Sequence, residues 1–228
     1  MPTEIALLDQ VILHINHGLA KVDGRRHDRG LNFLAVLLLE RAFGTLWRAR
    51  EDAVRGYSVQ SLMLCRAALE DWATLRYCES HLDQIGLWLG GVIEELPEEG
   101  RPPRFKQIWD DLGDMGQRME EIYGVLSQFA HPRAIGLKWL YHWDAESTYL
   151  HAGGYFDKRN LTICLYFLLG TSRMLLERIA QVQFRVLGDA DGGWVEKGLE
   201  ISSEVGTFMD RVHDDVLKDA PVEPDQAE

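Results

Sequence analysis

Apolar residues recur at helical spacing along most of the chain, and polar stretches divide this pattern into about six segments. Residues three and four apart share one side of an α-helix, so each segment is expected to bury one face. Ser58 is a favourable N-cap, while Gly90 and Pro132 follow the expected ends of the third and fourth segments. We therefore predict helices over residues 4–20, 31–55, 58–89, 104–130, 157–187 and 194–217.

The period changes to two residues between the fourth and fifth predicted helices. Apolar and polar or small residues alternate from Ile135 to Trp143, and a turn-forming Asp-Ala-Glu-Ser stretch precedes a second short run at 148–151. This pattern is typical of a hairpin. The sequence thus predicts a predominantly all-α protein, a bundle of about six helices with a small β-hairpin insertion around residues 135–151. One helical domain spans 1–217, and a disordered acidic tail follows at 218–228.

Composition and charge narrow the functional classes. Apolar residues make up 46% of the chain, as expected for a folded protein, and the net charge of -12 disfavours DNA and anionic membranes. The longest uncharged apolar run, about 160–172, is too short for a bilayer span. The N-terminus has no basic stretch typical of a secretory signal, and three separated cysteines favour reduced thiols. We expect a cytoplasmic protein.

The negative charge is concentrated at one end of the chain. Residues 187–228 hold 12 acidic and 3 basic residues, a net of -9, whereas residues 1–186 hold 24 acidic and 21 basic residues, a net of -3. Residues 21–55 are locally basic, with 8 bases against 5 acids. The distribution weakens the argument against a polyanionic partner such as RNA, without reversing it.

Arg66 lies in the middle of an apolar stripe on the third predicted helix. Leu62 and Leu69 flank it at helical spacing, and Glu70 follows one turn later. A guanidinium in such a place needs a paired, hydrogen-bonded environment, and Glu70 is the nearest partner. The order Arg-then-Glu is the weaker one for simple helix stabilisation, which favours a positioned site.

The fourth predicted helix carries a matching polar row. Tyr123, Ser127 and His131 follow one another at four-residue spacing, and His131 lies at the helix end, where the dipole raises its basicity. If the two helices pack together, Arg66 and Glu70 converge with this row. An acid/base, a fixed cation and hydroxyls together suit binding or processing of a phosphate or carboxylate. The alternative is that the groups only satisfy one another and cap the helix.

The motifs R-x-x-x-E in RAALEDWATLRY and Y-x-x-x-S-x-x-x-H in YGVLSQFAHP resemble a bacterial helical family of unknown function, over roughly residues 55–180. In outline that family is similar to HEPN domains, helical modules that often dimerise. Many HEPN domains are metal-independent ribonucleases of toxin–antitoxin and phage-defence systems with an R-x4–6-H motif. The resemblance implies a homodimer acting on RNA or a nucleotide. The R-x4–6-H motif matches only Arg76 to His81.

Other chemistries have less support in the sequence. The di-iron spacing E-x-x-H does not occur, nor do a glycine-rich phosphate loop, G-x-S-x-G or H-E-x-x-H. His14 and His17 lie three residues apart without an evident third ligand, so we expect no metal and no cofactor. Three hypotheses follow: a HEPN-like domain with His131 as acid/base and Arg66 as phosphate-holding cation, a non-catalytic dimeric interaction module, and a small-molecule sensor with the aromatic hairpin as lid.

Overall fold

The computed structural model describes residues 2–23, 30–89, 101–130, 141–143, 148–150, 157–189 and 191–219. Nearly all of these residues are helical, which confirms the predominantly α-helical class predicted from the sequence. The α-helices are α1 (Pro2–Leu19), α2 (Leu31–Val54), α3 (Ser58–Ser80), α4 (Gly86–Leu89), α5 (Phe105–Asp111), α6 (Gly113–Ala130), α8 (Lys158–Leu187) and α9 (Gly192–Asp219), with a 3-10 turn η1 (Leu82–Gln84) before α4.

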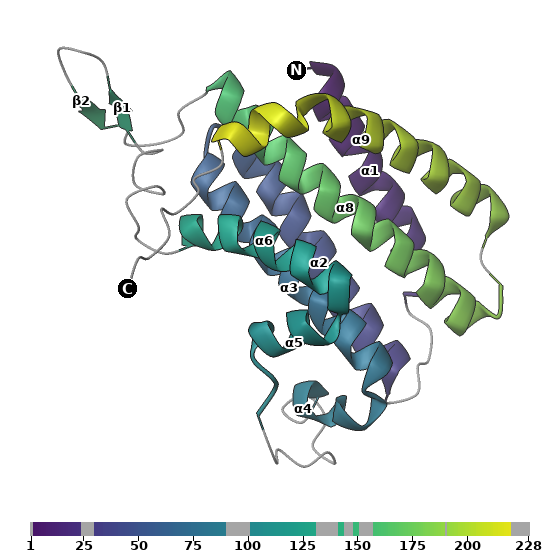
Figure 1. Ribbon diagram of the computed structural model, residues 1–228. Helices are drawn as coiled ribbons and strands as arrows, with labels where there is room; N and C mark the ends of the chain where they lie inside the picture. Colours follow the sequence, from purple (N-terminus) through teal and green to yellow (C-terminus); the bar gives the residue numbers. More distant parts are fainter. Residues whose placement is uncertain are drawn as a thin grey trace.

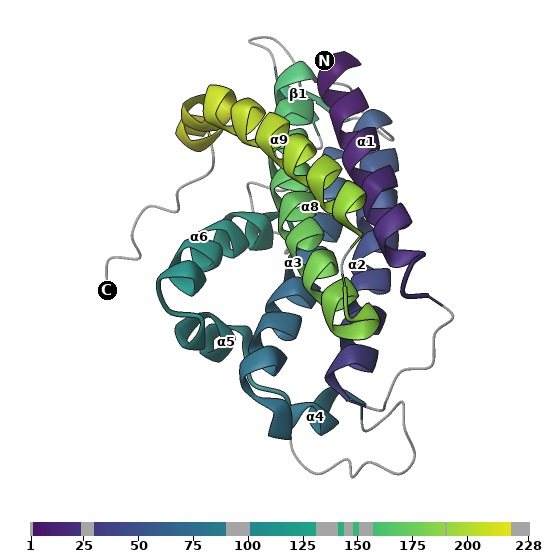
Figure 2. The same ribbon diagram turned by 90° about the vertical axis from the view of Figure 1, so that its right-hand side faces the viewer.

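The long helix α8 packs against α1, α2, α3 and α9 (Figure 1). Helices α2 and α3 form the most extensive pair, and α3 also carries α6. The view in Figure 2 shows α5 and α6 standing to one side of the other long helices. Helix α3 therefore lies between two environments, the main helical body on the α8 side and the smaller α5–α6 unit on the other.

The third helix is shorter than the sequence predicts. The sequence predicts one helix over residues 58–89, but α3 ends at Ser80, and η1 and the four-residue α4 follow. His81 leaves helical geometry at φ -129° and ψ 66°, and its ring Nδ1 lies 3.0 Å from the Tyr77 carbonyl oxygen. A carbonyl of the last turn thus gains a side-chain partner, which favours termination at this point.

The fourth helix, predicted over 104–130 as one element, is two helices joined by a sharp turn. Gly113 has φ 61°, a left-handed conformation that glycine adopts without steric penalty. Gly116 then packs against the preceding helix so closely that a Cβ atom there would lie 1.8 Å from the Trp109 carbonyl oxygen. These two breaks explain why about six predicted helices become eight α-helices within the described part of the chain.

Two short strands follow α6. β1 (Tyr141–Trp143) and β2 (Thr148–Leu150) pair in an antiparallel register, with Tyr141 opposite Leu150 and Trp143 opposite Thr148. The other residues of the predicted hairpin segment 135–151 lie outside the described residues. So does the predicted acidic tail from residue 220 onward, while α9 continues two residues beyond the expected end at 217.

Helix α9 is fastened to α1 by a pair of stacked rings. His14 and Trp194 lie parallel, with ring centroids 4.6 Å apart, and each ring nitrogen involved bonds to the other residue's backbone: His14 Nε2 to the Trp194 carbonyl at 2.9 Å and Trp194 Nε1 to the His14 carbonyl at 3.0 Å. Burial lowers the pKa of His14, which keeps the ring neutral. This contact closes the main body on the side away from α6.

Candidate functional site

Three of the predicted site residues meet between α3 and α6. Arg66 donates from Nε to Glu70 Oε1 at 3.1 Å and from Nη2 to the Tyr123 hydroxyl at 2.6 Å. The Tyr123 hydroxyl in turn donates to the same Glu70 oxygen at 3.0 Å. The three side chains form a closed triangle of hydrogen bonds, which we call the Glu70 cluster. Its convergence follows from one turn of α3 facing one turn of α6.

Helical spacing explains why α3 offers these groups to α6. Leu62 and Leu69, on the stripe that contains Arg66, are fully buried, so the Arg66 stem leaves an apolar face and its head emerges at the margin. The side chains of Arg66 and Glu70 keep 20% and 26% of their surface exposed. The cluster is thus half-buried at the edge of the α3–α6 interface.

Tyr123 is the neutral member of the cluster and contacts both charged residues. Burial, followed by the charge of Glu70, raises the pKa of its phenol, so the hydroxyl stays protonated and donates a hydrogen bond to the carboxylate. The Arg66 guanidinium also lies over the ring, with Cζ 4.7 Å from the centroid. The rings of Phe105 and Trp109 from α5 surround Tyr123 at centroid distances of 5.6 Å each. The Tyr123 ring therefore contacts both Arg66 of α3 and two aromatic rings of α5.

One edge of the cluster is open. Within the described residues, Nη1 of Arg66 donates no hydrogen bond and Oε2 of Glu70 accepts none. Some side-chain nitrogen and oxygen atoms of this protein are buried without a hydrogen-bond partner, but neither of these two atoms is among them. Both atoms are therefore accessible to solvent. A guanidinium N–H group and a carboxylate oxygen of the cluster thus remain available to a molecule arriving from outside.

The remaining two predicted site residues do not complete the cluster within the described structure. Ser127 Oγ donates to the Tyr123 backbone carbonyl at 2.6 Å, the usual i to i-4 bond of a serine inside a helix. His131 lies outside the described residues, directly after α6 ends at Ala130. The site therefore stands on Arg66, Glu70 and Tyr123, and the roles of the other two stay predictions.

A neighbouring ion pair was missed in the sequence. Arg41 of α2 donates from Nε to both carboxylate oxygens of Asp71, at 2.9 and 3.0 Å. Asp71 is almost fully buried, and burial raises its pKa in spite of the arginine, whereas the Arg41 side chain is mostly exposed. The charge of Glu70 is close enough to act on both groups. No local spacing connects residue 41 with residue 71, so only the packing of α2 on α3 reveals the pair.

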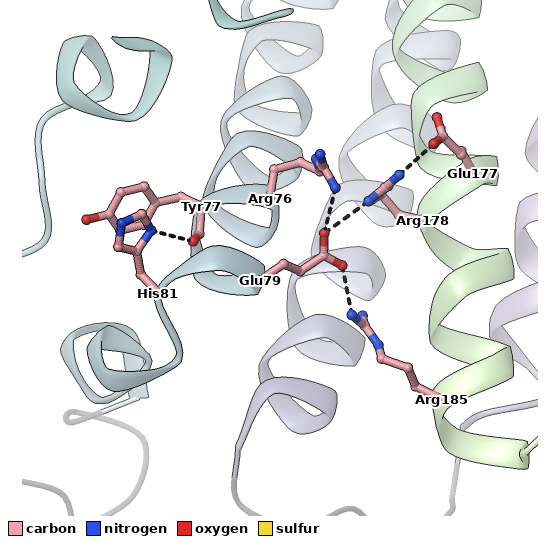
Figure 3. Close-up of polar contacts among 7 residues, drawn as sticks. All are labelled: Arg76, Tyr77, Glu79, His81, Glu177, Arg178 and Arg185. Carbon is pink, nitrogen blue, oxygen red and sulfur yellow. Dashed lines mark hydrogen bonds and ion pairs between the residues drawn. The ribbon is translucent and has the colours of Figure 1, made fainter. Parts of the chain in front are cut away.

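A second and larger polar group, the Glu79 network, lies at the end of α3 toward α8 (Figure 3). Glu79 accepts hydrogen bonds from Arg76 and Arg178 at 3.0 Å each, and from Arg185 at 2.9 Å. Arg178 also donates to Glu177 at 2.6 Å. Arg178 is 3% exposed. It occupies the apolar stripe of α8 as Arg66 does on α3, so the same stripe argument could have found it.

Arg76 and His81, the one sequence match to R-x4–6-H, do not share a site in this fold. Arg76 points toward α8 and joins the Glu79 network, as Figure 3 shows. His81 turns to the other side of the helix end, where its ring stacks on Tyr77 with centroids 4.1 Å apart. Arg76 thus contacts Glu79, whereas His81, directly after α3, contacts Tyr77.

The described residues contain no cluster of metal-binding side chains, and their cysteines are buried. No group of three or more His, Cys, Asp or Glu side chains is arranged there to hold a metal ion. His14 bonds to Trp194 rather than facing a ligand set with His17. Cys65, Cys78 and Cys164 are unpaired and buried, and burial raises the pKa of each thiol to about 12.

No protein-family model, no curated protein and no solved structure matches this chain. Among the described residues, no helix combines the length and apolar character that crossing a bilayer requires. The side chains of the aromatic strands and Trp139 lie outside the described residues, so the sensor hypothesis gains no contact from them.

Proposed function

We propose that this protein is a HEPN-like domain that acts on RNA or a nucleotide at the open edge of the Glu70 cluster. The observation that carries the proposal is the pair of solvent-facing atoms, Arg66 Nη1 and Glu70 Oε2, on side chains whose other edges are already fixed. A fixed arginine loses little further entropy when it binds a phosphate. Glu70 and Tyr123 are then positioning residues for Arg66.

The chemistry of RNA suits both atoms. Arg66 Nη1 would hold a phosphate oxygen, and Glu70 Oε2 would accept a hydrogen bond from the adjacent ribose 2′-hydroxyl. In metal-independent cleavage the 2′-oxygen attacks phosphorus, the P–O5′ bond breaks, and a 2′,3′-cyclic phosphate and a 5′-hydroxyl form. His131 is the acid/base in this proposal, because the sequence places it eight residues after Tyr123, directly after the last residue of α6.

The test compares two histidines. Purified protein is incubated with single-stranded RNA and with nucleotides in the presence of a metal chelator. We expect cleavage that falls by about a hundredfold or more in His131→Ala. His81→Ala is the matched control, because that imidazole stacks on Tyr77 away from the cluster, and it is expected to retain the wild-type rate. Substrates left intact by the folded wild-type protein would exclude the proposal.

The hydrogen bonds within the Glu70 cluster support a second candidate function. Arg66, Glu70 and Tyr123 satisfy one another and join α3 to α6, as expected for a non-catalytic interaction module in which the polar residues fix helix register. This candidate predicts a homodimer of twice 26.1 kDa by light scattering and no turnover of RNA or nucleotides. Under it, His131→Ala changes only the melting temperature.

A further inference from the structure

A cavity of ≈ 260 Å³ lies between α6 on one side and α8 and α9 on the other. Leu69 of α3 and Thr171 of α8 lie among its walls, and Thr171 is tied to α3 through a 3.3 Å contact with the buried Cys65 thiol. Methionines line it from all three of the outer helices, Met119 from α6, Met174 from α8 and Met209 from α9. Flexible, polarisable methionine side chains adapt their shape to an apolar guest.

The cavity exists because α3 holds α6 and α8 apart. Helix α6 packs mainly on α3 and α5, while α8 packs on α3 and α9, and the cavity lies between α6 and α8 with Leu69 of α3 among its lining residues. Gly170 widens it further, because this position of α8 has no side chain. A Cβ atom at Gly170 would already lie 3.1 Å from the Met209 methyl group. A larger side chain there would enter the cavity.

Two charged residues line the cavity, and only one of them is neutralised. Glu177 accepts a hydrogen bond from Arg178 at 2.6 Å, so its charge is balanced by the Glu79 network. Arg173 is exposed and forms no ion pair or hydrogen bond within the described part of the chain. Its guanidinium lies against α9 at Gly206, where an added Cβ would be 3.3 Å from Nη1. The apolar cavity therefore has a single uncompensated positive charge beside it.

We propose that this cavity binds a medium-chain aliphatic carboxylate, with the apolar chain among the three methionines and the carboxylate on Arg173. Charge complementarity selects an anionic head group, since a guanidinium and a carboxylate match in geometry. The volume lies just below the usual range for drug-sized ligands, which favours a short aliphatic chain. The site shares no residue with the Glu70 cluster, so this proposal stands independently of the proposed function.

Calorimetric titration with octanoate, kept below its aggregation concentration, tests the proposal directly. We expect saturable binding at one site, weakened about fourfold for each methylene removed from the chain. Octanol, which has the same chain without the charge, should bind at least about tenfold more weakly to the wild-type protein. Absence of saturable octanoate binding, or equal affinity for octanoate and octanol, would overturn the proposal.

Three variants identify the site. Arg173→Gln should weaken octanoate about tenfold and leave octanol binding unchanged, whereas Arg55→Gln removes an equal charge at the far end of α2 and should change neither. Gly170→Leu should abolish binding of both compounds by filling the cavity. Met119→Trp fills it from the α6 side and replaces Gly170→Leu if that variant does not fold. Wild-type octanoate affinity in a folded, filled variant would contradict the assigned location.

Discussion

Helix α3 carries two arginine–glutamate groups that differ in what surrounds them. The Glu70 cluster joins α3 to α6 with one arginine, one carboxylate and a neutral phenol, and one edge of it faces solvent. The Glu79 network joins α3 to α8 with three arginines around one carboxylate, and Arg178 and Glu79 keep only 4% and 11% of their side-chain surface exposed. Arg76 and Arg185 each keep 28% of their side-chain surface exposed, so the two groups differ chiefly in the exposure of the carboxylate, 26% for Glu70 and 11% for Glu79.

Unpartnered nitrogens distinguish the two groups further. In the Glu79 network, Nε of Arg76, Arg178 and Arg185 and Nη2 of Arg185 are buried without a hydrogen-bond partner. No such atom belongs to Arg66. Buried donors of this kind destabilise the fold unless a strong partner compensates, and Glu79 is that partner for all three arginines. The exposed carboxylate of Glu70, with one oxygen free of hydrogen bonds in the described structure, therefore selects the Glu70 cluster as the candidate site.

The largest expected effect comes from removing the central carboxylate of the sealed network. Glu79→Ala leaves three arginines facing one another, so we expect the free energy of unfolding to fall by about 3–5 kcal/mol, measured by denaturant titration. Glu177→Gln is the control, because that side chain is 68% exposed and contacts only one of the arginines. It should change stability by no more than about 0.5 kcal/mol. Equal effects of both variants would show that burial does not separate these carboxylates.

A backbone contact on the α6 side should have the next largest effect. Gly116→Ala places a Cβ atom against the Trp109 carbonyl and should destabilise the α5–α6 unit by about 1–3 kcal/mol. Gly124→Ala in the same helix meets nothing within 4 Å. That control should stabilise the protein by up to about 1 kcal/mol, since alanine is the better helix former. Opposite signs in the two thermal melts are the expected outcome. A stabilised Gly116→Ala would contradict the close approach of α5 and α6.

Loss of the Tyr123 hydroxyl should lower the free energy of unfolding by less than these changes, because the Glu70 cluster is half-buried. Tyr123→Phe removes both hydroxyl contacts, and we expect a loss of about 1 kcal/mol, which corresponds to roughly 2–4 °C in the melting temperature of a chain this long. Tyr57→Phe, at an exposed position, should stay within about 0.5 kcal/mol. If Tyr123→Phe lost as much stability as Glu79→Ala, the Glu70 cluster and the Glu79 network would not differ in their contribution to folding.

The smallest effect concerns the neutral ring pair of α1 and α9. The pKa of His14 is lowered by burial, so the stability it contributes is present above its ordinary value of 6.5 and is lost as the pH falls through the lowered value. Between about pH 7.5 and pH 5 the wild-type protein should lose about 1 kcal/mol or less through this residue. His14→Gln should flatten that part of the pH profile, whereas the exposed His17→Gln should not. Identical slopes in all three proteins would contradict a buried neutral His14.

Local patterns predicted the Glu70 cluster better than the rest of the polar architecture. Arg66 was found because its place in an apolar stripe depends only on helical geometry, and Glu70 and Tyr123 follow from four-residue spacings. The stripe argument applies to Arg178 as well, but its partner Glu79 lies 99 positions away, and no spacing pairs Arg41 with Asp71. Those contacts depend on how the helices pack.

The errors in helix boundaries have a similar origin. A glycine inside an amphipathic pattern is compatible with a continuous helix, and nothing local shows that Gly113 adopts φ 61° or that Gly116 allows α5 to fold back on α6. The end of α3 at Ser80 depends on His81 turning back onto Tyr77 rather than on a proline or glycine signal. Boundaries decided by single side-chain contacts are therefore the least predictable part of this fold.

The most direct test of the account is to measure RNA cleavage and thermal stability together in Arg66→Lys. Lysine keeps the charge beside Glu70 but lacks the guanidinium N–H group that faces solvent. We predict that cleavage in the presence of a chelator falls about a hundredfold or more, while the melting temperature changes by no more than roughly 4 °C. Unchanged cleavage in a folded Arg66→Lys variant would contradict the claim that the open edge of the Glu70 cluster is the functional site.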